Sequence, residues 1–181
     1  MTDGHLQIVV CGAAPAADAT KLLRLAQERN WSAAVTATPA SLDFFDLALA
    51  EEISGRPVKT SYQATISNSR ATAAADALII APATFNTINK IAAGIADNYA
   101  LASAAELIGR GVPTVIVPFV NSALARRPPF GNSIAALQAE GIRVLTGPIY
   151  GWEPHVPGRG AERLPTFPWA EALRLATDQV V

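Results

Sequence analysis

The chain has few of the residues that mark disulfide-rich or nucleic-acid-binding proteins. Its 181 residues include a single cysteine, Cys11, which excludes an internal disulfide and favours a reducing compartment. Charged residues make up only 16% of the chain and the net charge is -1. With no excess of positive charge, the composition gives no indication of binding to nucleic acid or to an acidic membrane. We therefore expect a small ligand that is neutral or is sequestered locally.

Long hydrophobic runs are also missing. No apolar stretch approaches the roughly 20 residues that a membrane-spanning helix requires. Residues 1–6 contain no basic region followed by an apolar core, so no signal peptide is evident, and we expect a cytoplasmic protein without a membrane partner. Aromatic residues are few, at 7%, whereas half of the chain is apolar. This composition suits close packing of helices on a sheet in one domain spanning residues 1–181.

Short apolar runs alternate with helical stretches along most of the chain. The helical stretches include one over Ala16–Arg29 and a short one around Trp169–Thr177, and a weaker strand is expected near Val58–Thr60. Five runs have the character of buried strands: Leu6–Cys11, Ser32–Thr36, Ala77–Ala81, Thr114–Val117 and Arg143–Leu145. The alternation predicts an α/β fold in which a parallel sheet has helices on both faces.

Residues 147–168 differ in character from the rest of the chain. They contain five prolines and four glycines, which we expect to be too many for regular structure. Such a segment is either a linker or an active-site flap. Because a helix is expected to follow it, we interpret it as a flap.

A polar turn follows the apolar run Ala77–Ala81. Thr84, Asn86 and Thr87 offer hydroxyl and amide groups beside the unpaired N–H groups of a helix start, and Ile88, Ile91, Ala92 and Ile95 then recur at helical spacing. A strand end of this kind is where α/β proteins bind ligands. The alternative interpretation is that Asn86 or Thr87 only caps the helix.

Three further strand ends are followed by small or polar residues. The expected strands lead into Gly12–Ala17, into the hydroxyl-rich segment Thr36–Ser41 and into Pro118–Asn121. Each turn taken singly is compatible with simple capping. Because the carboxyl ends of parallel strands share one edge of the sheet, a common ligand explains the turns better than independent caps do.

The segment Pro82–Asn98 resembles the PASANT signature of the homo-oligomeric flavin-containing cysteine decarboxylases. The match comprises Pro82–Thr87, Lys90-Ile91 and Gly94–Asn98, with Phe85 in place of the usual small residue. The family includes phosphopantothenoylcysteine decarboxylases and enzymes that oxidatively decarboxylate a C-terminal cysteine of a peptide. The resemblance implies a three-layer Rossmann-like (flavodoxin-like) fold and FMN bound at a subunit interface in trimers, which are sometimes assembled into dodecamers.

The resemblance also assigns residues. Pro118–Asn121 is similar to the family's PxMN motif, with Val120 for methionine, and implies that Asn121 holds the carboxylate of a cysteine substrate. Arg126 and Arg127, which follow, either attract that carboxylate or belong to a solvated loop. The implied substrate-binding residues are Asn86, Pro118, Val120, Asn121 and His155. The implied cofactor-binding residues are Gly12, Ala13, Thr36, Thr38, Ser41, Pro82, Ala83, Thr84, Asn86, Thr87 and Asp97.

Two departures from the family pattern concern catalysis. Asn68 stands where the family has a histidine that serves as acid/base near the thiol, so Asn68 is left to orient the thiol, and His155 is a candidate substitute. Residues 151–160 lack the cysteine with which phosphopantothenoylcysteine decarboxylases protonate the enethiolate. The expected reaction is therefore oxidative decarboxylation of a C-terminal peptide cysteine to an enethiol, with Asn68 and Asn121 as catalytic residues. The alternatives are a phosphopantothenoylcysteine decarboxylase and an FMN-binding regulatory or structural protein without decarboxylase activity.

Overall fold

Five parallel strands form the centre of the molecule in a computed structural model that describes residues 2–61 and 74–178. The strand order is β2-β1-β3-β4-β5, and every neighbouring pair is parallel. The strands are β1 Gly4–Val10, β2 Trp31–Ala37, β3 Ala77–Ala83, β4 Thr114–Pro118 and β5 Arg143–Val144. All five lie where the sequence predicts them, and every residue of β3 is buried, as expected of a strand covered on both faces.

Helices connect the strands and cover both faces of the sheet. The α-helices are α1 Thr20–Glu28, α2 Leu47–Ser54, α3 Phe85–Ala92, α4 Tyr99–Gly109, α5 Ser122–Ala125, α6 Pro128–Ala139 and α7 Trp169–Thr177. Short 3-10 helices are η1 Ala14–Asp18, η2 Pro39–Ser41, η4 Pro148–Tyr150 and η5 Gly160–Thr166. This architecture is the expected three-layer, flavodoxin-like α/β fold.

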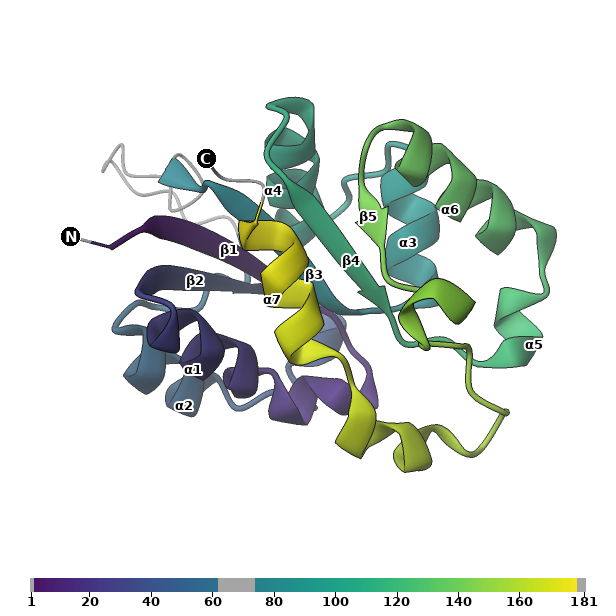
Figure 1. Cartoon of the computed structure of the whole chain (residues 1–181), viewed down its shortest axis with the longest axis horizontal. Helices are drawn as coiled ribbons and strands as arrows, with labels where there is room; N and C mark the ends of the chain where they lie inside the picture. Colours follow the sequence, from purple (N-terminus) through teal and green to yellow (C-terminus); the bar gives the residue numbers. More distant parts are fainter. Residues whose placement is uncertain (1, 62–73, 179–181) are drawn as a thin grey trace.

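Two hydrophobic clusters fill the spaces between the layers. Alternate residues of β1 supply both of them: Leu6, Ile8 and Val10 pack with residues of α1 and α7, whereas Val9 packs with residues of α3, α4 and α6. Figure 1 shows α7 crossing in front of the sheet, beside α1. No helix of the described part is long and apolar enough to cross a membrane.

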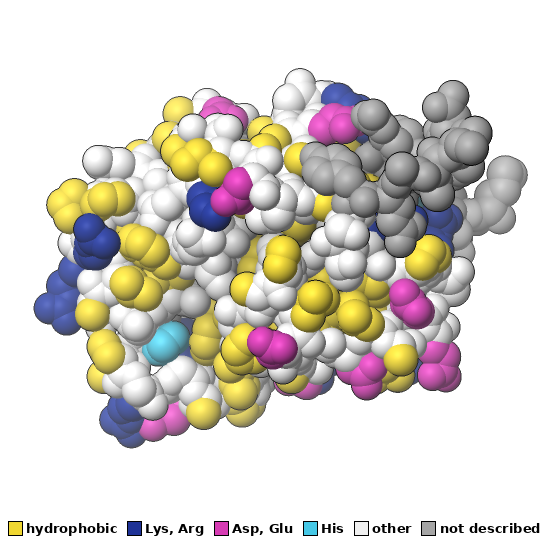
Figure 2. All heavy atoms as spheres, turned by 180° about the vertical axis from the view of Figure 1, so that it is seen from behind, with side chains coloured by type: hydrophobic (Ala, Val, Ile, Leu, Met, Phe, Trp, Pro, Cys, Tyr) yellow, Lys and Arg dark blue, Asp and Glu magenta, His cyan; other side chains and the backbone are white. Residues whose placement is uncertain are grey.

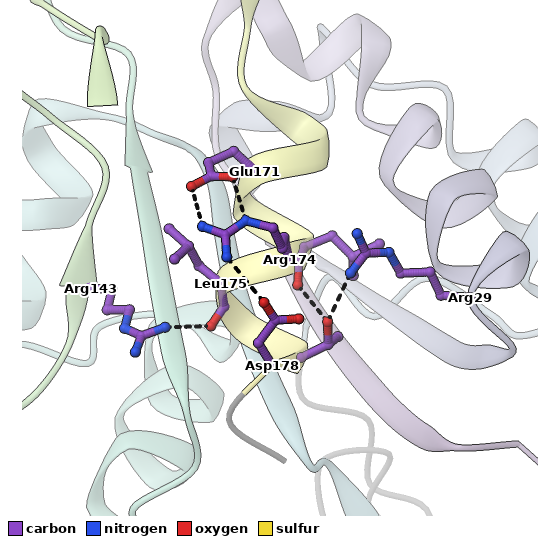
Figure 3. A network of polar contacts seen from close by, with 8 residues as sticks. Arg29, Arg143, Glu171, Arg174, Leu175 and Asp178 are labelled. Carbon is purple, nitrogen blue, oxygen red and sulfur yellow. Dashed lines mark hydrogen bonds and ion pairs between the residues drawn. The ribbon is translucent and has the colours of Figure 1, made fainter. Parts of the chain in front are cut away.

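Arginines from β5 and from the end of α1 hold the carboxyl end of helix α7 (Figure 3). Arg143 of β5 donates from Nη1 to the Leu175 carbonyl at 2.9 Å, and Arg29 donates to the Thr177 hydroxyl at 3.3 Å. The last carbonyls of a helix carry partial negative charge, so these guanidinium groups stabilise the end of α7. Helix α7 in turn packs across β3 and β4 and closes one face of the core.

Several boundaries differ from the sequence-based expectation. The expected helix Ala16–Arg29 is two elements, because the 3-10 helix η1 begins at Ala14, ahead of Pro15, and α1 begins only at Thr20. The expected strand near Val58–Thr60 is reduced to a single bridge between Thr36 and Lys59. Residues 147–168 hold two 3-10 helices, so the expectation of no regular structure there was wrong.

The end of α3 differs as well. The helix stops at Ala92, Gly94 adopts a φ of +69°, and the Ile95 N–H donates to the Lys90 carbonyl at 2.8 Å. Ile95 therefore lies beyond the helix, with 46% of its surface exposed, although its spacing predicted a place on the buried helical face.

Candidate functional site

The loops after four neighbouring strands meet at the carboxyl edge of the sheet. Backbone hydrogen bonds join them in sequence: Thr38 N–H donates to the Val10 carbonyl (3.0 Å), and Cys11 N–H to the Pro82 carbonyl (3.2 Å). Phe119 N–H donates to the Ala83 carbonyl at 2.8 Å. The three contacts bring together the ends of β2, β1, β3 and β4, as the sequence predicted.

The first two loops touch at backbone level. A Cβ atom placed on Gly12 would lie 2.3 Å from the carbonyl oxygen of Ala40, so only glycine permits this approach. Ala13 directly precedes η1, and its N–H donates to the Cys11 carbonyl at 2.9 Å. The Gly12 loop and η2 therefore form one continuous backbone surface at the ends of β1 and β2.

Three hydroxyl groups of the second loop differ in what they contact. The Thr36 hydroxyl accepts a hydrogen bond from Gln7 Nε2 at 3.0 Å, inside the sheet, and the Ser41 hydroxyl donates to the Thr38 carbonyl at 2.7 Å. The Thr38 hydroxyl is buried and has no hydrogen-bond partner among the described residues. A buried hydroxyl without a partner costs about 1–3 kcal/mol. Thr38 is thus the hydroxyl of this loop that a bound acceptor, such as a phosphate oxygen, would satisfy.

The loop after β3 is closed by a side-chain cap. Thr84 Oγ1 accepts from the Thr87 N–H at 3.2 Å and lies 3.0 Å from the Thr87 hydroxyl, so Thr84 caps α3. The expected alternative that Asn86 or Thr87 is the cap was therefore wrong. Asn86 lies in the first turn of α3 with its side chain exposed, on a groove of about 430 Å³ that also includes Phe85 and Lys90.

Cys11 lies against this cap. Its thiol is buried, and burial raises its pKa to about 11, while hydrogen bonds with the Thr87 side chain and the Thr84 backbone oppose the shift. The thiol is therefore protonated at neutral pH and is no nucleophile. No role for Cys11 in the site follows from the sequence, because nothing in its spacing reveals the contact with Thr84 and Thr87.

Asp97 pairs with a lysine of α3. Its carboxylate forms an ion pair with Lys90 at the end of α3, and that hydrogen bond lowers the pKa of Asp97. Asn98, next to it, caps α4 by accepting from the Leu101 N–H at 3.1 Å. The segment Gly94–Asn98 thus connects α3 to α4, and direct contact of Asp97 with a cofactor stays a prediction.

Asn121 caps α5 in a way that leaves its donor free. Its Oδ1 accepts from the N–H groups of Ala123 (3.1 Å) and Leu124 (3.0 Å), which assigns the other amide position as NH₂. That NH₂ has no hydrogen-bond partner among the described residues. An uncharged donor fixed at the end of β4 suits a carboxylate ligand.

The segment 147–168 is attached to the same strand end. Trp152 is buried and donates from Nε1 to the carbonyl of Pro118 at 2.7 Å. His155 N–H donates to the carbonyl of the buried Val120 at 3.2 Å. Its imidazole Nδ1 lies 3.0 Å from its neighbour's carbonyl, which accepts only, so Nδ1 is the donor of this contact.

These contacts do not place Asn68, Arg126 or Arg127 in the site. Asn68 lies outside the described residues. Arg126 turns back on α5, its Nε donating to the Ser122 carbonyl at 3.2 Å, and Arg127 directly precedes α6 with an exposed side chain. Among the residues that the structure describes, no three His, Cys, Asp or Glu side chains are grouped so as to hold a metal ion.

Comparisons with known proteins agree with this geometry. The model of the Flavoprotein family matches residues 1–159. A curated relative, the coenzyme A biosynthesis bifunctional protein CoaBC of Mycolicibacterium smegmatis, is 29% identical over 144 residues, which cover 78% of this chain and 34% of the relative. The chain thus spans about a third of the length of the curated relatives it matches.

Solved structures share the fold. The FMN-dependent cysteine decarboxylase TvaF from thioviridamide biosynthesis superposes with a TM-score of 0.72 at 21% identity, covering 97% of this chain and 99% of that one. The epidermin biosynthesis protein EpiD from Staphylococcus aureus gives a TM-score of 0.65 at 23% identity, covering 77% and 81%. The alignment with TvaF therefore includes nearly the whole of both chains.

Proposed function

This chain belongs to the Flavoprotein family, and on that basis we propose that it oxidatively decarboxylates a C-terminal cysteine of a peptide to an enethiol. The family and its FMN-dependent neighbours support FMN as the cofactor. The observation that carries the proposal is a pair of side-chain donors at one edge of the sheet that have no partner among the described residues. They are the Thr38 hydroxyl after β2 and the Asn121 NH₂ after β4.

The residues at the ends of β1 and β2 would hold the phosphate of FMN. Thr38 supplies a buried hydroxyl donor, and the close approach of Gly12 to Ala40 brings the backbones of the two loops together. The first turn of α3, with Asn86 exposed and Thr87 fixed by Thr84, would border the flavin ring. When bound, FMN supplies an acceptor for a hydride from the cysteine β-carbon.

The chain itself orients the substrate and handles its protons. The Asn121 NH₂ holds the substrate carboxylate, which fixes the direction of the cysteine side chain. His155 Nε2 accepts the thiol proton, which makes the loss of hydride from the β-carbon easier. The two-electron oxidation leaves a thioaldehyde, which loses carbon dioxide to give the enethiol.

An assay by mass spectrometry tests the reaction. The purified protein with FMN is incubated with peptides that end in cysteine, and with matched peptides that end in serine. We expect a mass loss of carbon dioxide plus two hydrogens from the cysteine peptides alone. Absence of that loss across a varied set of cysteine peptides, with FMN bound, would contradict the proposal and indicate an FMN-binding protein without decarboxylase activity.

Phosphopantothenoylcysteine decarboxylation is a second candidate, which the CoaBC relatives favour. The lack of cysteine in residues 147–168 speaks against this candidate, because phosphopantothenoylcysteine decarboxylases use a cysteine thiol there as the proton donor to the enethiolate. Offering phosphopantothenoylcysteine in the same assay separates the two: loss of carbon dioxide alone from that substrate would favour the second candidate.

We also propose that the site is completed by other copies of the chain in a trimer or a larger homo-oligomer. The face opposite to that of Figure 1 carries several hydrophobic patches with charged side chains scattered between them (Figure 2). Large hydrophobic residues that are at least one third exposed are Leu42, Phe44, Ile95, Leu124, Ile149 and Val156. Light scattering after size-exclusion chromatography tests the assembly, and a monomer with bound flavin would contradict it.

A further inference from the structure

Arg163 is a cation without a counter-ion near the carboxyl edge of the sheet. It lies in η5, half-buried, and its Nε is buried with no hydrogen-bond partner among the described residues. No described carboxylate pairs with it, although Arg159, on the same segment, pairs with Glu162 at 2.6 Å. A buried N–H donor without a partner is costly, so we expect Nε to meet an acceptor from outside the described chain.

The guanidinium of Arg163 is held in place by an aromatic ring. Its Cζ lies 4.5 Å from the centre of the Trp152 ring, a cation–π contact. Trp152 is itself buried and fixed by its hydrogen bond to the Pro118 carbonyl, the last residue of β4. A stacked guanidinium keeps its planar set of donors in one orientation, which suits the oxygens of a carboxylate or a phosphate.

The position of η5 connects both ends of the candidate site. Its first residue, Gly160, packs on the loop that leads to Asn121: a Cβ there would lie 3.2 Å from the rings of Phe119 and His155. The same 3-10 helix packs against η1, which follows the Gly12 loop (Figure 1). In the strand order, β3 lies between β1 and β4, so the two contacts of η5 are with segments that follow the strands on either side of β3.

From this placement we infer that Arg163 binds an oxyanion of a ligand at the carboxyl edge of the sheet, either the phosphate of the flavin or the carboxylate of the substrate. The inference rests on the proposed function for the identity of these ligands. It assigns positive charge to a site whose other donors, the Thr38 hydroxyl and the Asn121 amide, are neutral. Arg163 is then a binding residue of the segment 147–168.

The test compares ligands that differ only in the anion. Quenching of flavin fluorescence gives the dissociation constants of FMN and of riboflavin, which lacks the phosphate. Changes in the absorbance of bound FMN give those of a peptide ending in serine, as free acid and as amide. The variants are Arg163→Gln, which removes the charge, and Arg163→Lys, which keeps the charge but not the planar fork. Arg159→Gln, at an exposed and paired arginine four residues upstream, is the matched control.

We expect Arg163→Gln to reduce either the preference for FMN over riboflavin or the preference for acid over amide by about tenfold or more. The first result assigns the phosphate and the second the carboxylate, while Arg163→Lys lies between wild type and the Gln variant and Arg159→Gln leaves both preferences unchanged. Thermal unfolding confirms that each variant is folded, and Arg163→Lys serves alone if the Gln variant is not.

Two negative results are distinguishable. If wild type binds FMN and both preferences persist in the Arg163 variants, the inference is wrong and the proposed function stands. If wild type binds no flavin, the proposed function is wrong and the inference falls with it.

Discussion

Asn121 and His155 lie side by side in a parallel bridge, in which Ser122 N–H donates to the His155 carbonyl at 2.7 Å. A second hydrogen bond runs from His155 N–H to the Val120 carbonyl. Both are backbone contacts that do not involve the imidazole of His155, although that ring also packs on the ring of Phe119, with centroids 4.8 Å apart. The backbone attachment can therefore persist when the imidazole is replaced, which allows the chemistry of His155 to be tested.

Replacing His155 by glutamine should slow turnover and leave stability nearly unchanged. Glutamine keeps a polar side chain but has no group that accepts and returns a proton at neutral pH, and loss of a positioned base costs about 10²–10⁴ in rate. Single-turnover reduction of bound FMN by a cysteine peptide measures the effect. His5→Gln, at the opposite edge of the sheet, is the control and should leave the rate intact; equal rates for wild type and His155→Gln would exclude the imidazole as the base.

Asn121→Asp separates capping from substrate binding. Aspartate retains an oxygen for the N–H groups of Ala123 and Leu124, so α5 should keep its cap. The same change removes the NH₂ donor and places negative charge beside the carboxylate, so KM for a cysteine peptide should rise about tenfold to a hundredfold. Asn121→Ala, which also removes the cap, should lower the free energy of unfolding by about 1 kcal/mol. A KM unchanged in Asn121→Asp would remove Asn121 from the site.

Thr38→Val and Thr36→Val make a matched pair of hydroxyl deletions. Thr38 has an unpartnered buried hydroxyl, so its removal should leave the free protein as stable or more stable and weaken FMN binding by about tenfold. Thr36 accepts from Gln7, so its removal should lower stability by about 1 kcal/mol with less effect on FMN. Chemical unfolding and fluorescence titration measure both quantities. The reverse pattern would show that Thr36 is the residue that contacts the cofactor.

Cys11 should make the fold sensitive to alkaline pH. Its pKa is raised by burial from 9.0 to about 11, so the unfolded chain loses the thiol proton at lower pH than the folded chain does. Stability is therefore full below about pH 9 and falls, by roughly 3 kcal/mol, as the pH rises towards 11. Unfolding free energies of wild type and Cys11→Ala between pH 8 and 11 test this. A constant difference between the two curves would contradict the shift.

His5 should make the fold sensitive to acid. Its pKa is lowered by burial and by the charge of Arg56, with Asp76 opposing, and its Nδ1 lies 2.9 Å from the Ser32 hydroxyl. Stability is full above about pH 6.5, the pKa in the unfolded chain, and is lost as the pH falls through the lower pKa of the folded state. Compared with wild type, His5→Gln should lose less stability between pH 7 and 5. Parallel curves for the two proteins would show that His5 does not titrate abnormally.

The sequence predicts the sheet well because continuous apolar runs of this length report burial on both faces. All five strands lie where such runs occur, and the polar residues that follow four of them meet at one edge. Element ends are predicted less well because they depend on local hydrogen bonds. Thr84, not Asn86 or Thr87, accepts a hydrogen bond from an N–H of the first turn of α3. The chain turns at Gly94, which has a positive φ, so Ile95 lies outside the helix.

Side-chain contacts between residues far apart in the chain could not be predicted from the sequence. Thr36 and Thr38 look alike in the hydroxyl-rich segment, yet only the packing of β1 against β2 shows that Gln7 satisfies one and leaves the other unpaired. Likewise, Trp152 and Arg163 belong to a stretch rich in proline and glycine. Their stacking on the end of β4 follows from a contact with Pro118 across 34 residues of sequence.

The hydrogen bonds from Thr38, Cys11 and Phe119 to the carbonyls of Val10, Pro82 and Ala83 have a consequence for engineering. Each loop at the carboxyl edge supplies a backbone partner to its neighbour. A loop transplanted alone from a relative would therefore leave unpaired polar groups in the adjoining loops. Substrate range in this scaffold is better altered by changing side chains on the existing backbone, or by exchanging the four loops as one block.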